Sequence, residues 1–74
     1  MSDSARIEAA QLFDSLASEL EQAVAHARTA AEHYRSGETA RGAAHGFAVQ
    51  GHWARAGRTL EQLAEIHAAH ARPL

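Results

Sequence analysis

The sequence predicts an all-α antiparallel helical hairpin, and three observations point to it. Residues 5–35 contain neither glycine nor proline and are rich in alanine, glutamate, leucine, glutamine and arginine, which are all good helix formers. Residues 54–72 have a similar helical composition. Between these two segments, the stretch 36–53 holds four of the five glycines. Two helical arms joined by a turn therefore account for the chain.

Size and composition predict that this hairpin needs a partner. The chain has 74 residues and no cysteine, and much of its 46% hydrophobic fraction is alanine. A domain of this size buries only about 60% of its unfolded surface, and small scaffolds without disulfides or metals usually rely on association. We therefore expect one helical domain over residues 1–74 that self-associates, giving a four-helix bundle, or docks on a larger protein.

The first helix is predicted over residues 4–35, with Ser2 or Ser4 as its N-cap. Its length would be roughly 45 Å at about 1.5 Å per residue. Apolar residues recur in alternating steps of four and three, the heptad spacing of packed helices. With Phe13 at heptad position a, the apolar a and d columns contain Ala9, Phe13, Leu16, Leu20, Ala23, Ala27, Ala30 and Tyr34.

A turn at residues 36–38 should end the first helix, because Gly37 can supply the left-handed conformation of a C-cap. The second arm is predicted over residues 39–71. The same a and d spacing runs through Gly42, Gly46, Val49, Trp53, Ala56, Leu60, Leu63, His67 and His70.

Two interpretations of the second arm remain open at this point. One continuous helix would keep a single apolar face, but each interior glycine costs about 1 kcal/mol relative to alanine. Gly42 and Gly46 could repay that cost through close packing, whereas Gly51 falls on the outer face. A break at residues 51–52 would instead give a middle helix at 39–50 and a final helix at 53–71.

The broken arrangement resembles one tetratricopeptide repeat. Phe47, Gly51, Trp53, Ala56 and Leu60 have the spacing of that family's aromatic, glycine, aromatic, alanine and aromatic-or-leucine positions. The resemblance covers about 34 residues and a single repeat. It departs from the pattern at Ala40 and Ala68, where tryptophan and the closing proline are expected. The resemblance therefore implies a shared helix-turn-helix geometry and not membership of the family.

Four histidines form a candidate metal site. His26 and His33 occupy position g on the first arm, and His45 and His52 occupy position g on the second. Antiparallel helices place g beside g′, so these residues should line one flank of the hairpin in two cross-helix pairs, with Glu19 continuing the flank. Neutral imidazole suits zinc, copper, nickel or iron. The alternative is that these are solvated or structural histidines, since neither a Glu-x-x-His pair nor a His-Glu-x-x-His motif is present.

His67 and His70 lie three residues apart at positions a and d of the second arm. Such residues are typical of a core or a dimer interface. Should they be buried and neutral, association would weaken on acidification as they become charged. The oligomeric state at pH 8 and pH 5.5 checks this prediction, and an unchanged state would refute it.

The sequence offers little chemistry for catalysis or for nucleic-acid binding. The serines lack an adjacent histidine and acid constellation, and no glycine loop follows a strand. Arginines are diluted by glutamates in a chain of net charge −2, so we expect no nucleic-acid partner. No apolar run approaches the ~18 residues that span a membrane, and the N-terminus does not resemble a secretory signal. We therefore expect a cytoplasmic protein without a membrane partner.

The function expected from the sequence is a small non-catalytic protein–protein interaction module, an accessory or scaffold subunit without a cofactor. The alternative is a histidine-rich bundle that binds a transition metal. An enzyme site assembled between subunits is a third possibility. Tyr34, Phe47 and Trp53 cluster near the turn and should meet another surface. The residues expected at helix or subunit interfaces are Phe13, Leu16, Leu20, Tyr34, Gly42, Gly46, Phe47, Val49, Trp53, Leu60, Leu63, His67 and His70.

Overall fold

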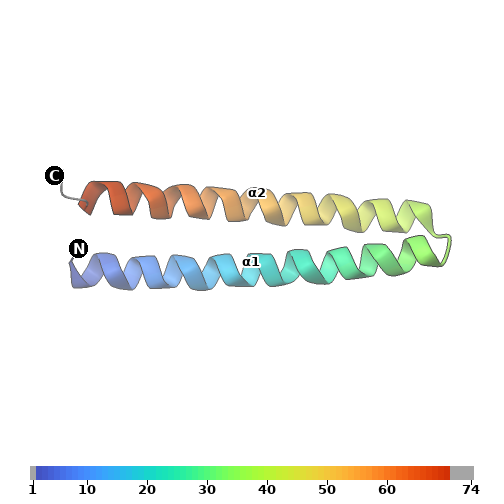
Figure 1. The fold of residues 1–74 in the computed structure, drawn as a ribbon, viewed down its shortest axis with the longest axis horizontal. Coiled ribbons are helices and arrows are strands. Elements are labelled where there is room, and N and C mark those ends of the chain that lie inside the picture. The colour runs from blue at the N-terminus through green and yellow to red at the C-terminus, as the bar shows by residue number, and fades with distance from the viewer. Residues whose placement is uncertain (1, 71–74) are drawn as a thin grey trace.

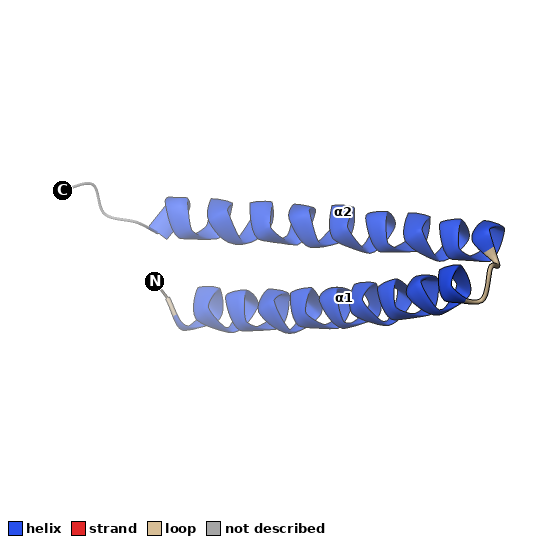
Figure 2. Ribbon diagram, turned by 45° about the vertical axis from the view of Figure 1, so that its right-hand side comes forward, coloured by secondary structure: helices blue, strands red, loops and turns tan. Residues whose placement is uncertain are grey.

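The computed structural model describes residues 2–70, which form two long antiparallel helices joined by a short turn (Figure 1). Helix α1 spans Asp3–Arg35 and helix α2 spans Thr39–His70. They lie side by side along their whole length in both ribbon views (Figure 2), within a body of 56 × 19 × 15 Å. Within the described residues, neither helix is long and apolar enough to cross a membrane.

Both ends of α1 are closed by local hydrogen bonds. At the start, the Ser2 hydroxyl accepts a hydrogen bond from the Ala5 amide at 3.1 Å, which is the N-cap role predicted for it. At the other end, Gly37 has a φ of 77°, the left-handed conformation that glycine adopts without strain. The Gly37 amide donates to the Tyr34 carbonyl and the Glu38 amide to the His33 carbonyl, at 3.2 and 2.8 Å. These bonds satisfy carbonyls that the end of a helix leaves open.

Helix α2 is continuous, so of the two interpretations left open for this arm, the single helix is the one observed and the break at residues 51–52 is not. Gly51 lies inside Thr39–His70 and is exposed. The helix-turn-helix geometry implied by the tetratricopeptide resemblance is therefore absent from this arm. The predicted last helical residue, Ala71, lies outside the described residues.

The two helices face each other through heptad columns d and g, whereas the sequence predicted columns a and d. The d column is largely inside, as the buried Leu16, Ala23, Ala56 and Leu63 show. The a column is not, because Phe13, Tyr34 and Trp53 expose 55%, 53% and 64% of their surface. The g column takes its place: the inward-lying g residues are Ala5, Leu12, Glu19, His26, His33, His45, His52, Thr59 and Ile66.

Side-chain size explains this rotation. The d column is rich in small residues such as Ala23, Gly42 and Ala56, which let two backbones approach closely. Directing the aromatic a residues inward would hold the helices apart. The rotated arrangement keeps the helices close and leaves the aromatic side chains of column a on an outer face.

Gly42 and Gly51 provide a matched test of this close packing. A Cβ at Gly42 would lie 2.6 Å from the Tyr34 ring, whereas a Cβ at Gly51 would meet nothing within 4 Å. We expect Gly51→Ala to raise the free energy of unfolding by about 1 kcal/mol through helix propensity. Gly42→Ala should fall short of that gain by about 1–3 kcal/mol, because the ring must move. Denaturant unfolding of both variants measures the difference, and equal stabilisation would contradict the packing at Gly42.

Candidate functional site

Four imidazole rings stack in a single row between the helices, alternating from one helix to the other. The row, here called the histidine ladder, runs away from the turn in the order His33, His45, His26 and His52. Neighbouring ring centroids lie 5.3, 5.3 and 5.2 Å apart, with interplanar angles of 19°, 34° and 22°. The structure thus brings together all four histidines that the sequence placed on one flank. These histidines are more buried than the flank position predicted for them, because column g faces the other helix.

Each end of the ladder is closed by a carboxylate. At the turn end, His33 Nδ1 lies 2.7 Å from Glu38 Oε2. At the other end, the buried His52 has its Nδ1 2.6 Å from Glu19 Oε2. Since a carboxylate only accepts, both contacts require a proton on Nδ1. The carboxylates therefore fix the tautomers of the two outer rings.

Arg55 takes part in the end of the ladder that lies away from the turn, where His52 meets Glu19. Its Nε donates to Glu19 Oε1 at 2.8 Å, so Glu19 is held by His52 on one oxygen and by Arg55 on the other. The hydrogen bond from His52, with smaller contributions from Arg55, holds the pKa of the Glu19 carboxyl below its ordinary value of 4.5, although desolvation opposes the shift. Arg55 Nη2 also lies 3.0 Å from His52 Nδ1. Because guanidinium cannot accept, that contact is not a hydrogen bond while Nδ1 donates to Glu19.

The two central rings contact each other directly. His26 Nδ1 and His45 Nδ1 lie 3.0 Å apart, a hydrogen-bonding distance for two ring nitrogens. Such a bond needs a proton on one nitrogen and a lone pair on the other. The central contact can therefore hold one Nδ1 proton and not two, and neither ring has a carboxylate within hydrogen-bonding distance.

The ladder distributes its nitrogens along a line and does not converge them on one point. Within residues 2–70, no group of three or more histidine, cysteine, aspartate or glutamate side chains is arranged to hold a metal ion. Glu19, which the sequence offered as an extra oxygen ligand, instead accepts from His52 and Arg55. The arrangement as it stands is suited to sharing protons between imidazoles and carboxylates.

A second feature, here called the apolar strip, lies along one face of the hairpin. It consists of columns a and e of both helices between residues 10 and 64, and none of these positions carries a charge. Leu20, Trp53 and Leu60 line one hollow of about 190 Å³, which shows that the two helices contribute to the same face. The larger members of the strip are Phe13, Leu20, Val24, Tyr34, Trp53 and Leu60.

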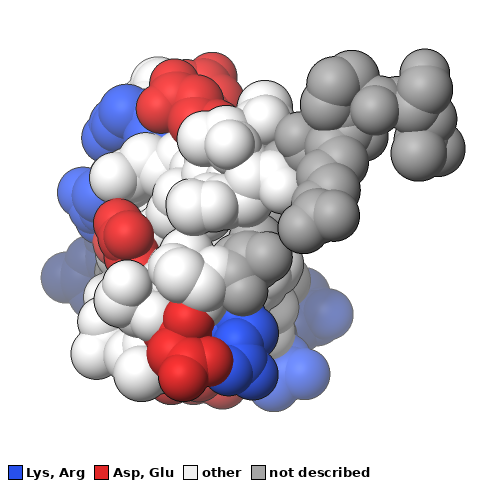
Figure 3. Space-filling view, turned by 90° about the vertical axis from the view of Figure 1, so that its left-hand side faces the viewer, with Lys and Arg blue, Asp and Glu red and all other residues white. Residues whose placement is uncertain are grey.

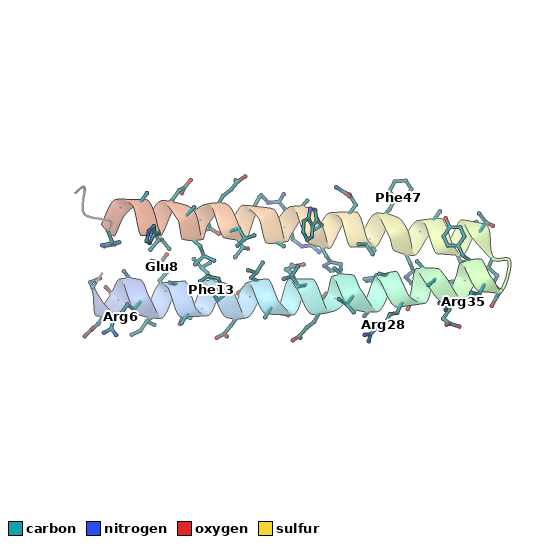
Figure 4. The ribbon with its side chains drawn as sticks, in the orientation of Figure 1. Arg6, Glu8, Phe13, Arg28, Arg35 and Phe47 are labelled. Atoms are coloured by element: carbon teal, nitrogen blue, oxygen red, sulfur yellow. The ribbon has the colours of Figure 1, made fainter. Side chains whose placement is uncertain are left out.

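The opposite face of the hairpin is polar. A shallow hollow there is lined by Ser15, Ser18, Glu19, Arg55, Arg58, Thr59 and Gln62. Arg28 and Arg35 lie on the side of α1 turned away from α2 (Figure 4). Viewed along the hairpin from the end where α1 begins, acidic and basic side chains are interspersed around the rim (Figure 3). Charge is thus mixed on the outer surfaces and missing from the apolar strip.

The residues predicted at interfaces separate into two groups. Leu16, Gly42, Val49 and Leu63 lie toward the other helix and are buried or half-buried. The others are exposed: Phe13, Leu20, Tyr34, Gly46, Phe47, Trp53, Leu60, His67 and His70. Phe47, at column b, exposes 79% of its surface and points away from α1 (Figure 4). In the single hairpin, His67 and His70 are therefore not core residues.

Sequence reasoning missed three contributors to these features. Val24 belongs to the apolar strip, and the charge-free e column would have revealed it. Glu38 and Arg55 close the ends of the histidine ladder. Their signal was weak, because an acid after a turn and an arginine beside a g position are ordinary on a solvated surface.

Comparison with protein-family models, curated proteins and solved structures finds no match.

The pKa of Glu19 gives a testable pH dependence. Because the folded-state pKa lies below the ordinary 4.5, the ionised carboxylate stabilises the hairpin above that pH, and the contribution is lost as pH falls through the folded-state pKa. We expect Glu19→Gln to have a lower melting temperature than the wild type at pH 7, with a gap that closes as the carboxyl becomes protonated. The exposed Glu21→Gln is the control. A gap of equal size at pH 7 and pH 3 would contradict the role of the charge.

Proposed function

We propose that this chain is a non-catalytic protein–protein interaction module whose partner is a second copy of itself. The apolar strips of two hairpins would face each other and complete a four-helix bundle. The observation that carries the proposal is the charge-free strip itself, which joins large apolar side chains of both helices on one face. Exposed apolar surface of this kind marks an interaction site.

The interior of the single hairpin supports association. Among residues 2–70, the buried apolar residues are Ala5, Leu16, Ala23, Ala56 and Leu63. Only two of these five residues, Leu16 and Leu63, have large side chains, so the hairpin buries little apolar surface for two helices of 33 and 32 residues. Small scaffolds of this kind usually rely on association for stability. Burial of the strip against another surface would supply the missing apolar contacts.

The shape of the strip favours a second copy over a larger partner. Large side chains alternate along it with small ones such as Ala27, Ala31, Gly46 and Gly57, as knobs and holes do between packed helices. A twofold pairing lets the same pattern serve both sides. The hairpin is 56 Å long and 19 Å wide, so one face offers on the order of 1,000 Å², comparable with the ~800 Å² that each partner buries in a stable interface.

A charge placed on the strip tests the proposal. We expect the wild-type protein to have twice the 7.9 kDa chain mass in light scattering at micromolar concentration. Leu60→Glu should weaken the dimer at least ~100-fold, because a buried unpaired charge costs about 3–5 kcal/mol. Gln62→Glu adds the same charge on the polar face and should leave the mass unchanged.

The same measurement distinguishes the other outcomes. A wild-type protein that stays monomeric and fully helical up to millimolar concentration would exclude self-association. The apolar strip would then be assigned to contact with a larger protein. Equal behaviour of Leu60→Glu and Gln62→Glu would show that association, if present, does not use the apolar strip.

A further inference from the structure

We propose that the central pair of the histidine ladder makes the hairpin sensitive to protons. The half of the hairpin nearest the turn is closed while His26 and His45 share one Nδ1 proton, and it opens when both rings are protonated. This device lies between the two helices of one chain and is separate from the apolar strip, so it does not depend on the proposed function.

The geometry of the central contact carries the proposal. The two Nδ1 atoms are 3.0 Å apart and are each other's hydrogen-bond partners. An imidazolium ring has protons on both nitrogens and no acceptor. With both rings protonated, two N–H groups would point at each other across that distance, and two like charges would lie within hydrogen-bonding range. The closed arrangement therefore accommodates one Nδ1 proton and excludes the second.

The groups that face the pair do not relieve this conflict. His33 stacks on His45 and His52 stacks on His26, so protonation of an outer ring brings further positive charge next to the pair. Glu38 and Glu19 accept hydrogen bonds from the outer rings only. Each carboxylate is also engaged by an arginine, since Arg41 lies 3.6 Å from Glu38 and Arg55 lies 2.8 Å from Glu19.

The surrounding core explains why the turn half would respond first. The buried leucines, Leu16 and Leu63, lie in the half that holds the chain ends. Between the turn and His52, the buried residues are only Ala23 and Gly42. Contacts between imidazoles thus make up much of the packing in this half. Segments with few apolar contacts are the ones that open locally.

Thermal unfolding between pH 8 and pH 5 tests the proposal, with EDTA present to exclude adventitious metal. Free imidazole takes up a proton near pH 6.5, at about the reference value for histidine. In the open chain both rings of the pair are free to be protonated, whereas the closed contact has room for one Nδ1 proton. Where the unfolded state can bind one more proton, stability falls as the pH is lowered. We expect the unfolding equilibrium constant to rise by up to about tenfold for each pH unit of acidification.

The variant His26→Asn/His45→Asn should lose this rise. Asparagine has a helix propensity close to that of histidine, and its amide can both donate and accept without titrating. The matched control is His67→Asn/His70→Asn, which removes two exposed histidines outside the ladder and should retain the wild-type pH dependence. A wild-type curve that is flat over this range, or a pair variant that follows the wild type, would overturn the proposal.

Two further measurements keep the test decisive. Light scattering at each pH separates opening of the hairpin from dissociation of a dimer. Should the pair variant fail to fold, nitrogen chemical shifts of the wild-type imidazoles at pH 8 decide the matter. One ring of the pair should carry its proton on Nδ1, and finding both protonated only on Nε2 would refute the shared proton.

Discussion

The close approach of the two helices is the constraint on which the rest of this structure depends. It is made possible by small d-column residues such as Ala23, Gly42 and Ala56, and Gly42 has no room for a Cβ beside the Tyr34 ring. The inward g positions between these closely packed helices hold the four imidazole rings. The histidines consequently lie inside, and Trp53 and Phe13 lie outside. The ladder and the strip are thus two results of one packing choice.

This division gives the hairpin an interior that is chemically unusual for its size. Buried polar groups are tolerated only when their hydrogen bonds are satisfied, and within the described residues no buried side-chain nitrogen or oxygen lacks a partner. His52 is only 8% exposed and is held by Glu19. Satisfied hydrogen bonds between the helices fix how α1 and α2 are aligned along their length, but each contributes little net stability. The large apolar side chains that could contribute more are on the outer face, where only a partner can bury them.

The element boundaries and the meeting of the four histidines could be predicted from sequence, because both follow from local rules. Gly37 sets the turn, and the shared g column fixes which rings come level across it. The rotation of the helices could not be predicted, since the d column belongs equally to an a/d and a d/g interface. Choosing between them requires weighing the bulk of Trp53 against the hydrogen bonds of His52 in three dimensions. The continuity of α2 through Gly51 was undecidable for a similar reason, because propensity and packing opposed each other.

The three-residue turn has a consequence for how this chain can change over time. Because an α-helix turns by about 100° with each residue, one residue inserted inside α1 or α2 would rotate every side chain between the insertion and the turn relative to the other helix. The ladder would lose its register and the strip its shared face in the same event. A residue added within the turn itself, at 36–38, need not have this effect, because a non-helical connection can absorb it. Changes in length should therefore be tolerated in the turn and not within the helices.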